Sequence, residues 1–277
     1  MDSKYAFEIC SGSLESALNA QQAGAQRVEL CSALALGGIT PSYGLIEQAR
    51  RRLKIDINVL IRPRHGDFLY ESEEVAVMIS DIQACAKMGV NGVVIGALDP
   101  YGNVDMDSCR AMVAVAKHLG LSVTFHRAID RARDIFSALE DAISLGVDRV
   151  LTSGGKPTAL EGLENLARMN TIAAGRIIIM PGAGVNAGNI KEILSVSGAR
   201  EIHFSGSEKY DSPMLYREGV SFTPDILGGD FTRTESSVEK IRAAIEAAGQ
   251  VPELSLSPVE DLQAELRCHS YCVFCYL

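Results

Sequence analysis

Hydrophobic and polar positions along this chain of 277 residues follow two alternating periods. Stretches with the 3.6-residue period of an amphipathic helix, such as residues 14–23 and 135–145, alternate with short runs rich in β-branched residues. Four of the helical stretches end at a glycine, which is followed by a short turn and a strand-like run. A glycine in this place predicts a left-handed residue just after the helix. The four repeats begin at Gly24, Gly89, Gly146 and Gly198.

Four further strand-like segments lie between these repeats, at residues 5–10, 55–62, 121–127 and 177–181. Together they give eight strands that alternate with helices, which predicts a parallel sheet with right-handed crossovers. An open doubly wound sheet would carry a glycine-rich dinucleotide turn after its first strand, but the chain has Cys10, Ser11, Gly12 and Ser13 there. We therefore predict an α/β fold, a single-domain (β/α)8 TIM barrel, and no organic cofactor.

The barrel is expected to span residues 1–249 and to be followed by a tail, residues 250–277. Ser236 and Glu239 form a capping-box pattern for a last helix at residues 237–248, and Gly249 follows it. The tail should hold a short helix from about Ser257, with proline at its first position. Its end carries the spacing of an iron–sulfur motif, at Cys268, Cys272 and Cys275. Radical enzymes carry that motif in an early loop, so we interpret the match as coincidence or as an opportunistic soft-metal site.

Composition and charge disfavour some of the classes to which this protein could belong. The chain has 26 basic and 35 acidic residues, a net charge of −9, and a pI near 5.1, which disfavours a nucleic-acid partner. No apolar run approaches the ~20 residues of a membrane helix. The first residues lead straight into a strand and have no leader-like apolar segment, so we expect a cytoplasmic protein, with the nucleus also open to it. The seven cysteines are then expected to be free thiols or metal ligands.

Two cysteines fall at the carboxyl ends of neighbouring strands, where such barrels place their chemistry. Cys10 ends the first strand and Cys31 the second, so their sulfurs can approach one another. Two thiolates are soft ligands that suit Cu(I) or zinc. The alternative is that both are small core residues.

Three arginines gather at the ends of the third and fifth strands: Arg62, Arg64 and Arg127. An arginine there needs a carboxylate or phosphate partner. Glu8 and Glu29 could supply it in a structural ion-pair network, or an anionic ligand could. Both interpretations stay open.

A further anion site is predicted where the seventh and eighth strands end. Gly182 and Gly184 let backbone amides approach a ligand, Ser205 lies on the neighbouring loop, and Asn186 is expected to cap the next helix. Phosphate often binds at this place in such barrels. The alternative is two tight turns that need glycine for their geometry.

Proton transfer at these strand ends could use Glu8, Glu29, His126 or Asp130. His126 lies on the fifth strand, where Glu29 or Asp130 could assist it, although a lone histidine is often structural. No lysine lies at a strand end, which disfavours a Schiff-base aldolase, and no histidine pair has the spacing of a zinc hydrolase.

Several motifs in a fixed order resemble the CutC copper homeostasis family over about residues 5–245. They are EIC at 8–10, GAQRVELC at 24–31, GGITPS at 37–42, IRPRHGDF at 61–68, TFHRA at 124–128, VLTSG at 150–154 and MPGAG at 180–184. The tail after about residue 250 is not part of this pattern.

The resemblance implies a cytoplasmic (β/α)8 barrel linked to copper tolerance, a homo-oligomer, and Cu(I) binding at Cys10 and Cys31. It implies no reaction. From the residues alone, the competing function is an enzyme that acts on a small anionic, perhaps phosphorylated, metabolite held by Arg62, Arg64 and Arg127 with the Gly182–Gly184 loop. A scaffold without chemistry is the third alternative.

Overall fold

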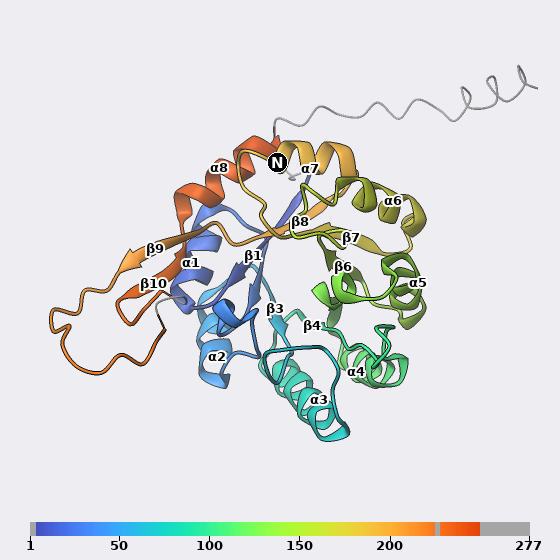
Figure 1. Ribbon diagram of the computed structural model, residues 1–277, viewed down its shortest axis with the longest axis horizontal. Helices are drawn as coiled ribbons and strands as arrows, with labels where there is room; N and C mark the ends of the chain where they lie inside the picture. The colour runs from blue at the N-terminus through green and yellow to red at the C-terminus, as the bar shows by residue number, and fades with distance from the viewer. Residues whose placement is uncertain (1–3, 225–227, 250–277) are drawn as a thin grey trace, which may run out of the picture.

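The computed structural model describes residues 4–224 and 228–249. Eight parallel strands lie at the centre and helices surround them, as the view down the barrel in Figure 1 shows. The barrel strands are β1 (Ala6–Ser11), β2 (Arg27–Leu30), β3 (Asp56–Leu60), β4 (Gly92–Ile95), β5 (Ser122–Phe125), β6 (Arg149–Thr152), β7 (Ile178–Pro181) and β8 (Glu201–Phe204). The predicted TIM barrel is confirmed.

Helices follow the strands in alternation and form the outer layer. They are α1 (Leu14–Ala23), α2 (Tyr43–Arg52), α3 (Ser72–Lys87), α4 (Met106–His118), α5 (Ile135–Leu145), α6 (Leu163–Ala173), α7 (Ile190–Ser197) and α8 (Val238–Gly249), with short 3-10 helices η1 (Leu34–Leu36) and η2 (Arg127–Arg131). The four repeat glycines all have positive φ, as predicted. None of the described helices has the length and hydropathy needed to span a membrane.

Hydrogen-bonded pairing runs around the barrel in the order β7-β6-β5-β4-β3-β2-β1-β8. Strands β7 and β8 lie against each other without a ladder between their described residues, so the barrel is nearly closed. Alternate side chains of each strand point outward and pack under the helices; Phe7, Ile9, Ile57 and Phe125 are fully or almost fully buried there. The remaining side chains of each strand point into the barrel. The rim formed by the carboxyl ends of the strands is here called the mouth.

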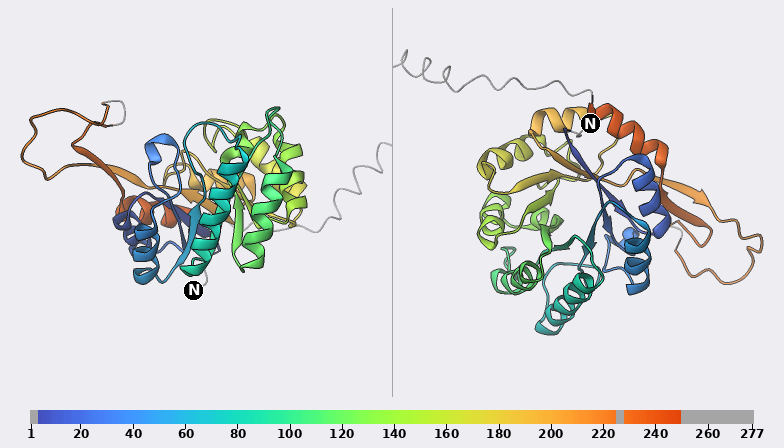
Figure 2. Two further views of the ribbon diagram at one scale, coloured as in Figure 1. Left: turned by 90° about the horizontal axis from the view of Figure 1, so that it is seen from below. Right: turned by 180° about the vertical axis from the view of Figure 1, so that it is seen from behind.

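A two-stranded arm was not predicted. After β8 the chain forms the antiparallel pair β9 (Ser207–Asp211) and β10 (Thr232–Ser236), and the segment between them projects from the barrel (Figures 1 and 2). Both strands are short, charged and largely exposed, so they lack the apolar pattern by which the other strands were found.

Two helix starts were placed wrongly. Ser236 belongs to β10, and Ser237 makes the side-chain contacts at the start of α8 instead. Helix α7 begins at Ile190 after Asn189, three residues later than expected, because the backbone at Asn186 forms a turn first. Cys268, Cys272 and Cys275, with the rest of the tail, lie outside the described residues, so the interpretation of that motif stays a prediction.

Candidate functional site

A network of buried charged side chains lies inside the barrel, on the side away from the mouth. Glu8 is fully buried, and its carboxylate accepts hydrogen bonds from Arg27 and, at 3.1 Å, from Asn58. The other end of the Arg27 guanidinium pairs with Glu201, whose carboxylate also lies 3.1 Å from Nε of Arg149. Each charge therefore has a partner of opposite sign, as a buried ion needs.

A second cluster lies directly above, at the mouth, and it contains the predicted thiol pair. The sulfurs of Cys10 and Cys31 are 3.9 Å apart. A carboxylate oxygen of Glu29 and both sulfurs lie within 4.8 Å of one another. His203 of β8 connects this cluster to the network below, since its Nδ1 is 2.8 Å from Glu8 and its Nε2 is 3.6 Å from Glu29. These residues, namely Cys10, Cys31, Glu29 and His203, are called the thiol cluster below.

The surroundings shift the pKa values of the two thiols in opposite directions. A hydrogen bond from Cys31 lowers the pKa of Cys10 to about 5 against the effect of burial, and His203 assists. The same hydrogen bond, with burial, raises the pKa of Cys31 well above its ordinary value. The surroundings therefore favour the thiolate form of Cys10 and the thiol form of Cys31.

The imidazole and the carboxyl of the thiol cluster are shifted as well. Burial lowers the pKa of His203, but its hydrogen bonds to Cys10 and Glu8 and the charge of Glu29 outweigh burial and raise the pKa well above the ordinary value. Burial raises the pKa of Glu29 to about 8, although His203 opposes the rise. These shifts favour a Cys10 thiolate that faces a His203 imidazolium.

This donor set fits a soft metal ion. Two sulfurs on adjacent strands, one of them favoured as a thiolate, offer the ligands that Cu(I) prefers, and the neighbouring carboxyl oxygen could complete a third position. Cys10 is half-buried, whereas Cys31 is buried and packs with Leu60 and Val94.

Arg62 lies at the mouth, but it does not pair with Glu8 or Glu29. Its guanidinium donates to the carbonyls of Gly38 at 2.8 Å and Gly66 at 2.6 Å. Of the two open alternatives, the pairing of Glu8 with the mouth arginines is not found, because Arg27 is the register partner of Glu8 on β2 whereas Arg62 lies beyond the end of β3.

Arg64 and Arg127 hold loops in place. Arg64 pairs with Glu74 at 2.6 Å and with Asp67 at 3.1 Å. Arg127 pairs with Asp130 at 2.8 Å. Asp130 also accepts hydrogen bonds from the side chain of Thr152 and from the backbone of Ser153, so this carboxylate fastens η2 to the end of β6. A role of these three in catalysis or anion binding stays a prediction.

His126 is buried at the end of β5, and within the described residues no hydrogen bond or ion pair joins it to Glu29 or Asp130, which could have assisted it. Its Nδ1 accepts a hydrogen bond from the backbone amide of Ala128 at 3.2 Å, and its Nε2 has no partner among the described residues. Burial and the nearby charge of Arg62 lower its pKa to about 3. The neutral ring therefore carries its proton on Nε2.

The two glycines that follow β7 have packing reasons to be glycine. A Cβ on Gly182 would lie 2.6 Å from the side chain of Leu151, and one on Gly184 would lie 3.1 Å from Thr158. The amide of Gly182 already donates to the carbonyl of Thr152 at 3.0 Å. Ser205 donates to the hydroxyl of Ser207 at 3.2 Å. The structure thus accounts for the two turns, and anion binding there stays a prediction.

His203 is the residue whose role the sequence did not indicate. It lies on β8 directly opposite Glu8 in the strand register, and both side chains point into the barrel. The available signal was its alternation with the outward Ile202 and Phe204, which places it on the inner face. The closing of β8 onto β1 was needed to bring it to Cys10.

The fold and this site define a class: (β/α)8 barrels with a thiol pair at the mouth. The sequence matches the model of the CutC family over residues 5–208. The family protein CutC of Xylella fastidiosa strain 9a5c is 49% identical over 246 residues, covering 88% of this chain and 89% of that protein. The family protein CutC of Parabacteroides distasonis is 46% identical over 244 residues, covering 87% and 100%. The chain belongs to the CutC family.

Solved structures agree with this assignment. CutC of Streptococcus agalactiae, provisionally described as a copper homeostasis protein, superimposes with a TM-score of 0.69 at 31% identity, covering 73% of this chain and 98% of that one. Thiamine phosphate pyrophosphorylase of Pyrococcus furiosus gives a TM-score of 0.55 at 14% identity, covering 90% and 98%. The second match shows that the fold is shared and carries no further meaning.

Proposed function

We propose that this protein is a cytoplasmic copper-handling protein that binds Cu(I) through Cys10 and Cys31. The observation that carries the proposal is the 3.9 Å separation of the two sulfurs at the mouth. The copper homeostasis description of the Streptococcus agalactiae relative supports it. Copper is the cargo here, and the residues act as its ligands.

The thiol cluster would prepare the site for a monovalent soft ion. The surroundings favour the thiolate form of Cys10, and Cys31 would give up its proton when the ion binds. His203 balances the negative charge of Cys10 when no ion is present, and Glu29 lies close enough to be a third ligand.

The test is a Cu(I) titration against a competing chelator without oxygen. The Cys10→Ser/Cys31→Ser variant should lose the tight site, because hydroxyls are poor ligands for Cu(I). The matched control is Cys85→Ser/Cys109→Ser, which removes two free, buried thiols on helices α3 and α4 and should leave the tight site unchanged. Equal affinity of the wild type and the Cys10/Cys31 variant would contradict the proposal.

A second function is an enzyme that acts on a small anionic metabolite. The observation in its favour is that Glu8, His203 and Cys10 form a connected carboxylate–imidazole–thiolate row, which a two-sulfur metal site does not require. A screen of phosphorylated and carboxylated metabolites by thermal shift, with Arg62→Ala as the comparison, tests it. If no compound stabilises the wild type, this function is contradicted.

We also propose that the protein is a homo-oligomer, as the family resemblance implies. The exposed apolar side chains of the arm support this proposal, since contiguous apolar surface often marks a contact between proteins.

A further inference from the structure

The thiol pair at the mouth has the geometry for a second kind of chemistry, the formation of a disulfide bond. The sulfurs of Cys10 and Cys31 are 3.9 Å apart and share a hydrogen bond. An S–S bond is about 2.05 Å long, so the two sulfurs need to approach one another by roughly 2 Å. The other two cysteines of the described residues lie on separate helices, Cys85 on α3 and Cys109 on α4.

The positions of the two residues on their strands determine what kind of bond they would form. In the register of β1 and β2, Cys10 lies opposite Glu29. Cys31 comes two residues after Glu29, directly beyond the end of β2, so it is a diagonal neighbour of Cys10. A diagonal bond needs a small shift of the chain at Cys31, and a bond with imperfect geometry is easier to reduce. The pair therefore suits a reversible bond better than a permanent one.

The two thiols differ in how well a reagent can reach them. Cys10 is half-buried, whereas Cys31 is 1% exposed. Because the susceptibility of a cysteine to oxidation follows its exposure, the reaction should begin at Cys10, and Cys31 should act second as the buried partner. Cys85 and Cys109 are 1% and 0% exposed, which protects them from the same reagent.

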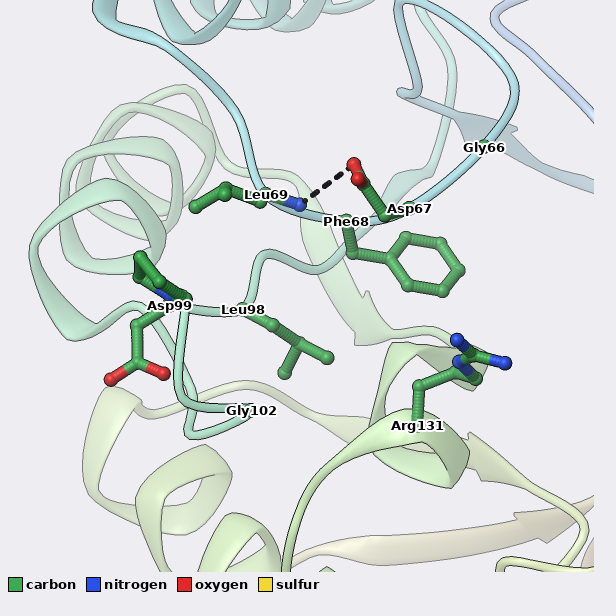
Figure 3. Close-up of a pocket in the computed structure, with 9 residues that line it drawn as sticks. Gly66, Asp67, Phe68, Leu69, Leu98, Asp99, Gly102 and Arg131 are labelled. Carbon is green, nitrogen blue, oxygen red and sulfur yellow. Dashed lines mark hydrogen bonds between the residues drawn. The ribbon is translucent and has the colours of Figure 1, made fainter.

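A pocket on the same side of the barrel is separate from the thiol pair. It has a volume of about 440 Å³ and lies on the loops after β3 and β4, with Phe68, Leu98 and Arg131 in its wall (Figure 3). None of the residues that line it is a cysteine. This pocket therefore does not hold a large substrate against the sulfurs. The oxidant that fits the half-buried Cys10 is a small one that enters between side chains at the mouth, such as hydrogen peroxide.

We propose that hydrogen peroxide joins Cys10 and Cys31 in a disulfide bond that closes the copper site. In the first step the sulfur of Cys10 attacks one oxygen of the peroxide, the O–O bond breaks, one molecule of water leaves, and Cys10 becomes a sulfenic acid. In the second step the sulfur of Cys31 attacks the sulfur of Cys10, the S–O bond breaks, and a second molecule of water leaves. The two thiols lose two protons and two electrons, which reduce the peroxide to water.

The bond would remove the ligands that bind Cu(I). A disulfide has no thiolate, and the thiolate is the form that binds a metal, so the oxidised protein would keep only Glu29 of the three neighbouring donor groups. This consequence rests on the proposed copper function, whereas the formation of the bond does not. A dithiol such as dithiothreitol should reopen the site by thiol–disulfide exchange.

The test is treatment of the reduced, metal-free chain with hydrogen peroxide, followed by alkylation in denaturant, digestion without reductant and mass spectrometry. We expect peptides joined through Cys10 and Cys31 at peroxide concentrations that leave Cys85 and Cys109 open to alkylation. Dithiothreitol should abolish the joined peptides. The Cys85→Ser/Cys109→Ser variant is the matched control and should form the bond like the wild type. Because the peptides identify the joined residues, reaction at the cysteines of residues 250–277 is not confused with this bond.

The Cys31→Ser variant tests the order of the two steps. Without the second thiol the reaction should stop at the sulfenic acid of Cys10, which dimedone labels, and the wild type should gain little label there because Cys31 consumes the sulfenic acid. Two outcomes would overturn the proposal: peroxide gives no peptides joined through Cys10 and Cys31 in the wild type, or dimedone labels Cys10 equally in the wild type and in Cys31→Ser.

A Cu(I) titration of the oxidised chain separates this proposal from the copper function. The oxidised chain should lose the tight site and regain it after reduction and removal of the reductant. If the bond forms but the reduced chain does not bind Cu(I), the copper function fails and the oxidation site remains. If the reduced chain binds Cu(I) but peroxide does not form the bond, the oxidation site alone fails.

Discussion

Glu8 and Glu29 are both buried in the barrel, but their pKa values are shifted in opposite directions. Burial raises the pKa of each carboxyl. At Glu8, the charge of Arg27 and the hydrogen bond with His203 outweigh burial and hold the pKa at about 2. At Glu29, burial is the largest effect and the opposing charge of His203 does not outweigh it, so the pKa rises to about 8. Whether a carboxyl in this barrel is charged therefore depends more on the charged group nearest to it than on how deeply it is buried.

His126 should make the protein sensitive to acid. Its pKa is about 3 in the folded state against an ordinary 6.5, so as the pH falls below 6.5 the unfolded chain takes up a proton that the folded chain refuses. Stability is complete above pH 6.5 and is lost as the pH falls toward 3. Between pH 7 and pH 4.5, the free energy of unfolding should fall by roughly 2 kcal/mol less in His126→Gln than in the wild type. Urea unfolding at both pH values measures this difference. His65→Gln, at an exposed residue, should not change the loss; an identical loss in both variants would contradict the prediction.

The charge of Arg27 should be costly to remove. Arg27→Met leaves the carboxylates of Glu8 and Glu201 without their shared cation inside the barrel, so the free energy of unfolding should fall by roughly 3–5 kcal/mol. Arg51→Met breaks an exposed pair with Glu47 on one helix and should cost less than about 1 kcal/mol. Chemical denaturation of both variants checks the difference, and similar losses would show that the buried network is not stabilising.

At the scale of elements, the arm is fastened to helix α1. Ser13 caps α1 by accepting from the amide of Ser16 at 3.0 Å, and its hydroxyl donates to Glu235 of β10. The hydroxyl of Ser16 also donates to Glu235 at 2.6 Å and accepts from the amide of Ser236 at 2.9 Å. One carboxylate thus joins the first helix to the last strand, more than 200 residues later in the chain.

Ser13→Ala should cost more stability than the loss of an ordinary cap. The variant loses the cap of α1 and one contact to Glu235, so we expect a loss of roughly 2 kcal/mol. Ser42→Ala removes the cap of α2, where Ser42 accepts from the amide of Leu45, and should cost about 1 kcal/mol. Hydrogen exchange should also become faster at residues 232–236 in Ser13→Ala alone. Equal effects of the two variants would mean that the contact between α1 and the arm contributes nothing.

At the scale of the molecule, the arm leaves the barrel on the side of the mouth (Figure 2). The segment between its two strands carries large exposed apolar side chains. Leu215 is 97% exposed, Phe222 is 90% exposed and Val220 is 82% exposed. A barrel is complete without such an arm. The division into a barrel of residues 1–249 and a tail stays a prediction, since residues 250–277 lie outside the described part.

We expect the chain to self-associate and the arm to contribute to the contact. Sedimentation equilibrium should give a mass above that of one chain for the wild type, and Leu215→Ser/Phe222→Ser should weaken the association about tenfold or more, because two large apolar side chains are lost from the contact. Tyr101→Ser, which removes an exposed ring from the barrel, should leave it unchanged. A monomeric wild type, or equal association of all three, would contradict the prediction.

The sequence by itself determined the barrel and the position of the thiols. The helical and strand periods, with the four glycines that end helices, are local properties of the chain, and they predicted the eight strands and their order. Because parallel strands end at one rim, the same pattern predicted that Cys10 and Cys31 would be neighbours, and their sulfurs are 3.9 Å apart.

Only the tertiary structure decided which charged groups are partners. Arg27, rather than Arg62, holds Glu8, and His203 reaches Cys10 because β8 closes onto β1, nearly 200 residues away in sequence. Strands β9 and β10 pair with each other although their charged sequences have no apolar pattern. The reason is physical: periodicity records which face of an element is buried, whereas ion pairs and shifted pKa values depend on distances of a few ångströms between elements, which are fixed only when the barrel closes.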